Sequence, residues 1–119
     1  MSPKLLRITL NSNQPEDLVQ FYSALGFSFT KREVDKGSTS WQGNSQNMVM
    51  EVYGIQETFS RSIPAVQLSF AVQNLEKIVQ KIKQLGCQVM MEPLETDRGW
   101  MSYLLDPDGR SIELWQDRN

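Results

Sequence analysis

Apolar and polar residues alternate along residues 5–10, which predicts a β-strand with one buried face. From Pro15 the pattern changes, and apolar side chains recur three and four positions apart, as on one face of an amphipathic helix. Pro15, Glu16 and Asp17 favour a helix start, and Gly26 favours its end. The apolar stripe consists of Leu18, Phe21, Tyr22 and Leu25.

The same order of elements occurs twice along the chain. The first half continues with strands predicted at residues 27–32, 39–42 and 47–53. The second half predicts a strand at 65–72, a helix capped by Asn74 and ended by Gly86, and strands at 88–92, 100–105 and 111–115. The segment Asp106-Pro107-Asp108-Gly109 predicts a tight turn before the last strand.

The two halves also match residue by residue. Leu18-Val19-Gln20 returns sixty residues later as Ile78-Val79-Gln80, and Met50-Glu51-Val52-Tyr53 returns sixty-two residues later as Ile112-Glu113-Leu114-Trp115. We predict one α+β domain over residues 1–119, made of two βαβββ units at 1–54 and 64–119 that a linker at 55–63 joins. The expected architecture is a curved, mostly antiparallel sheet with the helices outside.

Four polar residues occupy matched places in this repeat. Arg7 corresponds to Gln67 in the first strands, and Glu51 corresponds to Glu113 in the last strands. Strand parity puts all four on the face away from the helices. A solvated sheet face accounts for such residues without any function. However, the same face also carries Val, Leu, Tyr and Trp, and a half-apolar face with a few polar groups is typical of a small-molecule pocket, which we favour.

The composition excludes several classes of function. The chain has no histidine, which rules out hydrolases with a His base and metal sites built on imidazole. A net charge of −2 with scattered Lys and Arg argues against nucleic acid as a partner. No apolar run approaches the roughly 20 residues that span a membrane. The single Cys87 cannot form an internal disulfide, which favours a cytoplasmic location.

Two segments resemble the vicinal oxygen chelate superfamily, which includes glyoxalase I, bleomycin-resistance proteins, fosfomycin-resistance proteins and extradiol dioxygenases. The segment Phe21-Tyr22-Ser23-Ala24-Leu25-Gly26-Phe27 is similar to the superfamily's helix signature. The segment from Asp106 to Leu114 is similar to its "DPDGxxIEL" ending. The resemblance covers nearly the whole chain and implies the fold, whereas the superfamily's several chemistries leave the activity open.

In metal-dependent members of this superfamily the ligands come from the first and last strands of each unit. The matching positions are Arg7, Glu51, Gln67 and Glu113, so the resemblance implies Glu51, Gln67 and Glu113 as ligands if a metal binds. Arg7 departs from the pattern because a guanidinium has no lone pair to donate and stays cationic. We therefore expect no cofactor, and we expect Arg7 to bind Glu51, Glu113 or both in the metal's place. Mg²⁺ or Mn²⁺ on the three remaining ligands is the disfavoured alternative.

Three hypotheses for function follow. The first is a metal-free protein that binds a small neutral or cationic molecule in a cleft between the units, because two Glu and one Arg leave a negative charge there. The second is a glyoxalase-type lyase or isomerase, in which Glu113 has a raised pKa and acts as a base while Arg7 stabilises an enolate-like oxygen. The third is a scaffold domain with a vestigial pocket.

Aromatic side chains are the expected walls for a ligand, and core packing explains each of them as well. They are Trp41, Tyr53, Trp100, Tyr103 and Trp115. The resemblance further implies a homodimer, and it leaves open whether the site is built within one chain or across two.

Overall fold

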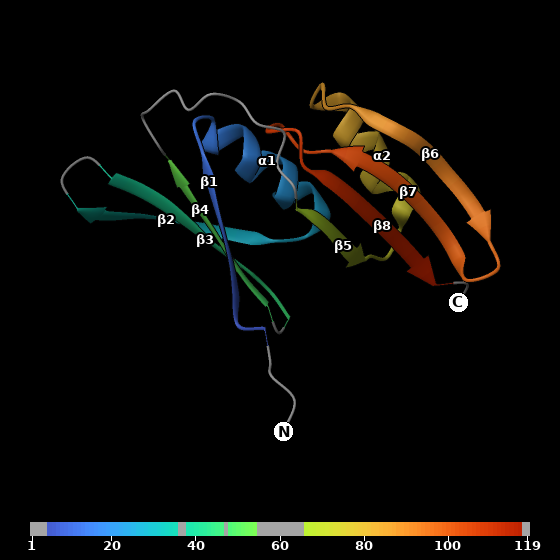
Figure 1. Cartoon of the computed structure of the whole chain (residues 1–119), viewed down its shortest axis with the longest axis horizontal. Helices are drawn as coiled ribbons and strands as arrows, with labels where there is room; N and C mark the ends of the chain where they lie inside the picture. Colours follow the sequence, from blue (N-terminus) through green and yellow to red (C-terminus); the bar gives the residue numbers. More distant parts are fainter. Residues whose placement is uncertain (1–4, 36–37, 47, 55–65, 118–119) are drawn as a thin grey trace. The chain divides into compact units, whose positions relative to one another are not determined.

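The computed structural model describes residues 5–35, 38–46, 48–54 and 66–117. The chain divides into two compact units, Met1–Ser60 and Arg61–Asn119. Each unit has the order strand, helix and three strands, as Figure 1 shows by its colours and labels. The predicted linker at residues 55–63 lies outside the described residues.

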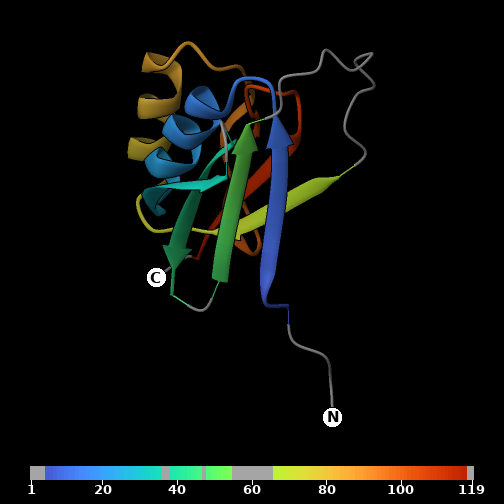
Figure 2. The same cartoon turned by 90° about the vertical axis from the view of Figure 1, so that its left-hand side faces the viewer.

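The first unit is a four-stranded sheet with one helix on one face. Its sheet has the strand order β1-β4-β3-β2, in which β1 runs parallel to β4 and the other two pairings are antiparallel. Figure 2 shows β1 and β4 side by side, with α1 on one face of the sheet. The elements are β1 (Arg7–Ser12), α1 (Pro15–Leu25), β2 (Ser28–Asp35), β3 (Ser38–Ser45) and β4 (Met48–Gly54).

The second unit repeats this arrangement. Its sheet has the order β5-β8-β7-β6, with β5 parallel to β8 and antiparallel pairings elsewhere. Helix α2 contacts β6, β7 and β8. The elements are β5 (Gln67–Ala71), α2 (Leu75–Gln84), β6 (Val89–Thr96), β7 (Gly99–Leu105) and β8 (Ser111–Asp117). The prediction of an α+β fold built from two βαβββ units with mostly antiparallel strands is confirmed.

Each unit has its own apolar core between helix and sheet. In the first, the predicted stripe residues Leu18, Phe21 and Tyr22 are fully buried, and the Phe21 and Tyr22 rings pack edge to face with centroids 5.0 Å apart. In the second, Val79 and Ile82 of α2 are buried, as are Leu104, Ile112 and Leu114 of the strands that α2 contacts. Burial of each such side chain stabilises the fold by roughly 1.5–3 kcal/mol, so these stripes fix which sheet face each helix covers.

Two details of the predicted elements are wrong. The first strand begins at Arg7 rather than Leu5, and Leu6, which the alternation placed on the buried face, is 71% exposed. Asn74 occupies the N-cap position of α2 but makes no capping hydrogen bond, and its φ of 60° is left-handed. Instead, the Leu75 N–H donates to Oε1 of Gln116 on β8 at 2.6 Å.

The predicted turn between β7 and β8 is held by its own side chains. Asp106 Oδ1 accepts the backbone N–H groups of Asp108 and Arg110, each at 2.9 Å. The Arg110 guanidinium pairs with Asp106 at 3.1 Å and with Asp108 at 3.0 Å, and Gly109 takes the positive φ of 90° that the turn needs. The polar residues of this motif therefore have a structural task within the turn.

No helix in the described ranges has the length and apolar character needed to cross a bilayer.

Gly43 provides a test of the packing in the first unit. A Cβ at this position would lie 2.6 Å from Cε1 of Phe29, and the Phe29 ring itself packs against Phe27. We expect Gly43→Ala to lower the free energy of unfolding by about 1–3 kcal/mol, because the ring must move. Urea unfolding measures the change, with Asn44→Ala, at an exposed neighbour on the same strand, as the control. Equal stability of the two variants would contradict this packing.

Candidate functional site

The sheet face away from α1 is centred on Glu51. Strand register aligns Glu51 with Thr9 on β1 and with Gln42 on β3, so these three side chains share the open face. The neighbouring residues Met50 and Val52 point to the opposite, helix-covered side and are fully buried. Glu51 is itself only 8% exposed, although it lies on the open face. A carboxylate with so little access to water needs partners from the protein.

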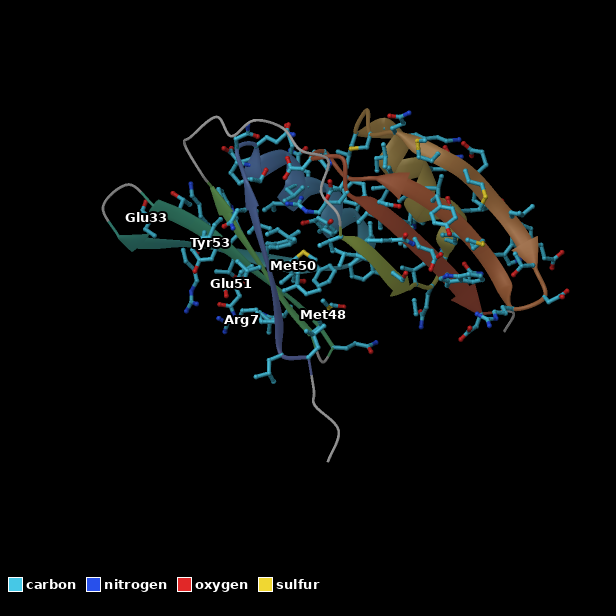
Figure 3. The ribbon with its side chains drawn as sticks, viewed as in Figure 1. Arg7, Glu33, Met48, Met50, Glu51 and Tyr53 are labelled. Atoms are coloured by element: carbon cyan, nitrogen blue, oxygen red, sulfur yellow. The ribbon has the colours of Figure 1, made fainter. Side chains whose placement is uncertain are left out.

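Both oxygens of the Glu51 carboxylate have such partners. Arg7 Nη1 lies 2.8 Å from Oε1, and the Tyr53 hydroxyl donates to Oε2 at 3.1 Å. Figure 3 shows Arg7, Glu51 and Tyr53 together beside β1 and β4. The predicted ion pair of Arg7 with Glu51 is thus present, and pairing of Arg7 with Glu113 stays a prediction. Because the Arg7 side chain is 57% exposed, the ion pair contributes about 0–1 kcal/mol.

Glu113 holds the matching place in the second unit, with a larger set of donors. Its register partners on the open face are Ser69 on β5 and Tyr103 on β7. Oε1 accepts hydrogen bonds from Trp115 Nε1 at 2.7 Å and from the Ser69 hydroxyl at 2.8 Å. Oε2 accepts one from the Tyr103 hydroxyl at 2.8 Å. All three donors are neutral, and no Lys or Arg of the described residues forms an ion pair with Glu113.

These hydrogen bonds lower the pKa of Glu113. The largest cause is the bond from Trp115, followed by those from Tyr103 and Ser69, and burial opposes them weakly. A carboxyl whose folded pKa lies below its unfolded pKa adds stability that is present above the unfolded value and lost as the pH falls through the folded value. The donors stabilise the ionised form of Glu113 and so disfavour the raised pKa that a general base there would need, and the role of Glu113 as a base stays a prediction.

The pKa values of Tyr53 and Tyr103, whose hydroxyl groups donate to the two carboxylates, are raised. The pKa of Tyr103 is raised chiefly by its hydrogen bond to Glu113 and then by the charge of that carboxylate, while a hydrogen bond from Gln67 lowers it. The pKa of Tyr53 is raised in the same way by Glu51. Each hydroxyl therefore stays protonated past the ordinary tyrosine pKa, and its hydrogen bond is lost as the pH rises through the raised value.

Comparison of the two units shows what the copies share. In both, a Glu in the middle of the last strand accepts a hydrogen bond from the aromatic residue two positions further on, Tyr53 or Trp115. The units differ in the other donors: Arg7 in the first unit, Ser69 and Tyr103 in the second. Ser69 was missed as a site residue: strand parity places it on the same face as Gln67, and its position beside Glu113 follows from the register of β5 with β8.

The remaining predicted site residues divide between the two faces. Gln67 lies on the open face. It is two residues before Ser69 on β5 and so shares its face, and Ser69 is aligned with Glu113. Trp41 does not share the face of Glu51, because register aligns it with Val52 and Leu10 on the helix side, where the Lys31 ammonium lies 5.9 Å from its ring centroid. Trp100 also lies on the helix side, aligned with Gln116. That Arg7, Glu51, Gln67 and Glu113 form one site stays a prediction.

The two carboxylates are poorly prepared for a metal ion. Each oxygen of Glu51 and Glu113 already accepts a hydrogen bond from the protein, and one of these donors is the cationic Arg7. Within the residues that the structure describes, no three Asp, Glu or Cys side chains gather closely enough to hold a metal. A divalent ion at either carboxylate would have to displace protein donors, among them Arg7 at Glu51, and the absence of a metal stays a prediction.

Comparisons with known proteins agree with the fold. The sequence matches the model of the Glyoxalase/Bleomycin resistance protein/Dioxygenase superfamily over residues 4–114. Comparison with the curated proteins gives no match. The structure is similar to that of hypothetical protein SA1046 from S. aureus, with 21% identity, 98% of each chain covered and a TM-score of 0.71.

Two further solved structures show the same fold. Glyoxalase I from Zea mays is 20% identical, with a TM-score of 0.78, and the match covers 98% of this chain and 45% of that one. Fosfomycin resistance protein FosX from Mesorhizobium loti is 15% identical, with a TM-score of 0.72, and the match covers 97% of this chain and 92% of that one. Identities this low show a common fold and leave the activity undefined.

The hydrogen bonds to Glu113 predict the behaviour of its pKa. Trp115→Phe removes the donor with the largest effect, so we expect the pKa of Glu113 to rise toward the ordinary glutamate value. A ¹³C NMR titration of the side-chain carboxyl groups measures it. Trp41→Phe is the control, because Trp41 lies on the helix side of the first unit's sheet. An unchanged Glu113 pKa in Trp115→Phe would show that the 2.7 Å hydrogen bond is not formed in solution.

Proposed function

Because the chain belongs to the Glyoxalase/Bleomycin resistance protein/Dioxygenase superfamily, we propose that it binds a small cationic or neutral organic molecule without a metal ion. The proposed contact surface is the open sheet face around Glu113. The main support for the proposal is the negative charge of this carboxylate, which no cation in the described part of its own unit balances. Its three partners are neutral, whereas the charge of Glu51 is balanced by Arg7.

The state of Glu113 suits it to anchor a cation. Its lowered pKa keeps it ionised at neutral pH, and Oε2 accepts one protein hydrogen bond where Oε1 accepts two. A carboxylate oxygen has room for two hydrogen bonds, so Oε2 has room for one from a ligand. An ammonium or amidinium group would make a charge-assisted hydrogen bond there, while an anion would be repelled.

The surroundings of Glu113 favour a ligand with an apolar part. Register places Ala71, Trp115, Met101 and Leu94 in one row on the open face, beside the row that holds Glu113. Leu94 is 52% exposed, and Trp115, Met101 and Tyr103 are half-buried. Methionine and aromatic side chains around one charged group are typical of surfaces that bind organic cations.

We also propose that the protein holds no resident metal ion. Metal analysis of the purified protein and the variant Arg7→Gln test this part of the proposal. We expect the purified protein to contain no stoichiometric divalent metal and to melt at the same temperature with Mg²⁺, Mn²⁺ or EDTA. Arg7→Gln removes the cation on Glu51, so any response of the melting temperature to Mn²⁺ should appear in this variant and not in the parent. A bound metal in the parent protein, or a strong metal-dependent rise of its melting temperature, would overturn the metal-free assignment.

Binding at Glu113 is tested with three matched compounds that differ in charge: 2-phenylethylamine, 2-phenylethanol and phenylacetate. The Trp115 Nε1–H signal in ¹⁵N NMR spectra reports on this face, since it is hydrogen-bonded to Glu113. We expect the amine to shift it most, the alcohol less and phenylacetate least. Glu113→Gln should weaken amine binding at least about threefold, as expected for a partly exposed charge pair.

The control for this experiment is Glu16→Gln, which removes an exposed carboxylate of α1 in the other unit. It should leave the response of Trp115 unchanged. Saturable binding of the amine to Glu113→Gln with the affinity of the parent protein would contradict the proposal.

Other aspects of function stay predictions. A glyoxalase-type reaction with Glu113 as base is disfavoured by the direction of its pKa, and a scaffold with a vestigial pocket would bind none of the three compounds. The homodimer implied by the family resemblance and the cytoplasmic location inferred from Cys87 are likewise predictions.

A further inference from the structure

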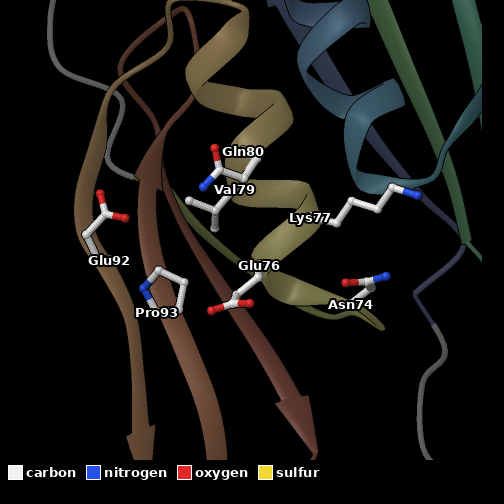
Figure 4. A pocket seen from close by; sticks show the side chains of 7 residues that line it. All are labelled: Asn74, Glu76, Lys77, Val79, Gln80, Glu92 and Pro93. Carbon is white, nitrogen blue, oxygen red and sulfur yellow. The ribbon is translucent and has the colours of Figure 1, made fainter.

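A groove runs along the helix side of the second unit, between the start of α2 and β6. One part has a volume of ≈ 440 Å³ and is lined by Asn74, Leu75, Glu76, Pro93, Trp100 and Gln116. An adjoining part of ≈ 380 Å³ shares Asn74, Glu76 and Pro93 and extends along the helix, as Figure 4 shows. Both volumes lie within the range of small-molecule sites, about 300–1,000 Å³.

This groove is separate from the surface around Glu113. Gln116 follows Trp115 on β8 and points to the opposite face, where it bonds to the Leu75 N–H at the start of α2. Trp100 is aligned with Gln116 in the sheet and so lies on the same side. A molecule in the groove and a molecule at Glu113 would therefore be divided by the sheet.

Several polar groups of the groove have no partner in the described part of the chain. The Glu76 carboxylate, the Asn74 side-chain amide and the Trp100 indole N–H form no hydrogen bond or ion pair there. Both oxygens of Glu51 and of Glu113, by contrast, are engaged by protein donors. The polar groups of the groove are thus available to a ligand.

The charge of the groove selects the kind of ligand. Glu92 is balanced by Lys83, whose Nζ lies 2.7 Å from Oε1 of Glu92. Lys77 lines the adjoining part of the groove, and its side chain extends away from the strand that carries Glu92 and Pro93 (Figure 4). The part of the groove that contains Trp100 is not lined by Lys77, and Glu76 is the one charged residue among the described residues that line it.

A helix start usually attracts anions, and here two features oppose that. The Leu75 N–H is already bonded to Gln116 at 2.6 Å, and the Glu76 carboxylate lies in the first turn of the helix. Both reduce the positive character of the helix end.

The apolar walls suit a flat group. Trp100 and Pro93 are half-buried and belong to neighbouring strands. The register of β6 is irregular between Met91 and Leu94, which is where Pro93 lies, and such bulges re-aim side chains next to binding sites. We propose that this groove binds an organic monocation, with its ammonium group beside Glu76 and its flat apolar part against Trp100 and Pro93.

The test uses the three tryptophan indole N–H signals in ¹⁵N NMR spectra, assigned by single Trp→Phe replacements. In a titration with 2-phenylethylamine, the Trp100 signal should move saturably. 2-Phenylethanol, its neutral counterpart, should bind the groove about fivefold more weakly, the size of one partly exposed charge interaction. Glu76→Gln should weaken binding of the amine by a similar factor. The amine and the alcohol should then bind this variant with equal affinity.

Two matched variants show whether the response of Trp100 depends on Glu76 in particular. Lys77→Gln, at the next residue, which lines only the part of the groove without Trp100, should leave the dissociation constant within about twofold. Glu113→Gln should leave the Trp100 response unchanged while it alters the Trp115 response.

The outcomes distinguish this proposal from the proposed function. If the amine moves the Trp115 signal and leaves Trp100 unmoved, the groove proposal is wrong and the site at Glu113 stands. Movement of Trp100 alone supports the groove and contradicts the Glu113 site. Equal affinities for amine and alcohol, or stronger binding of phenylacetate at Trp100, would overturn the assignment of a cation to the groove.

Discussion

The parallel pairing of the first and last strand in each unit is the constraint on which the rest of both units depends. Its register aligns Leu10 with Val52 and Leu68 with Ile112, and these apolar pairs face the helices. A shift by one residue would turn every side chain to the other face, so burial of the pairs fixes the register. Because side chains alternate along a strand, Glu51 and Glu113, which are adjacent to Val52 and Ile112, then lie on the open face. The positions of both carboxylates thus follow from the packing of the core.

The two units keep this framework and differ in how they stabilise its central charge. The first unit uses a cation, Arg7, and a tyrosine hydroxyl, so the charge of Glu51 is balanced within the unit. The second uses three neutral donors and remains negative around Glu113. Substitution at a few strand positions has therefore given two copies of one fold different electrostatics. A duplicated unit allows this because neither copy must change its core to change its surface.

The sequence predicted what depends on local periodicity. The helix stripes and the strand faces of Glu51 and Glu113 follow from residue spacing, and the ion pair of Arg7 with Glu51 was expected from the family resemblance. What it could not predict depends on register between distant strands. The face of Trp41, the donors Ser69 and Tyr103 and the direction of the Glu113 pKa each require knowing which residues lie side by side. Leu6 shows a different limit, since alternation continues past the point where β1 loses its partner strand.

The hydrogen bond from Leu75 to Gln116 has a consequence for how the second unit folds. Its acceptor lies 41 residues further along the chain than its donor. A helix capped by its own preceding residue can form locally, whereas α2 acquires the acceptor for its first N–H once β8 has joined the sheet. Helix initiation and sheet completion are then coupled, which raises the sequence separation of the contacts that folding must bring together. The second unit should consequently assemble cooperatively, with the start of α2 among its last parts to become protected from solvent.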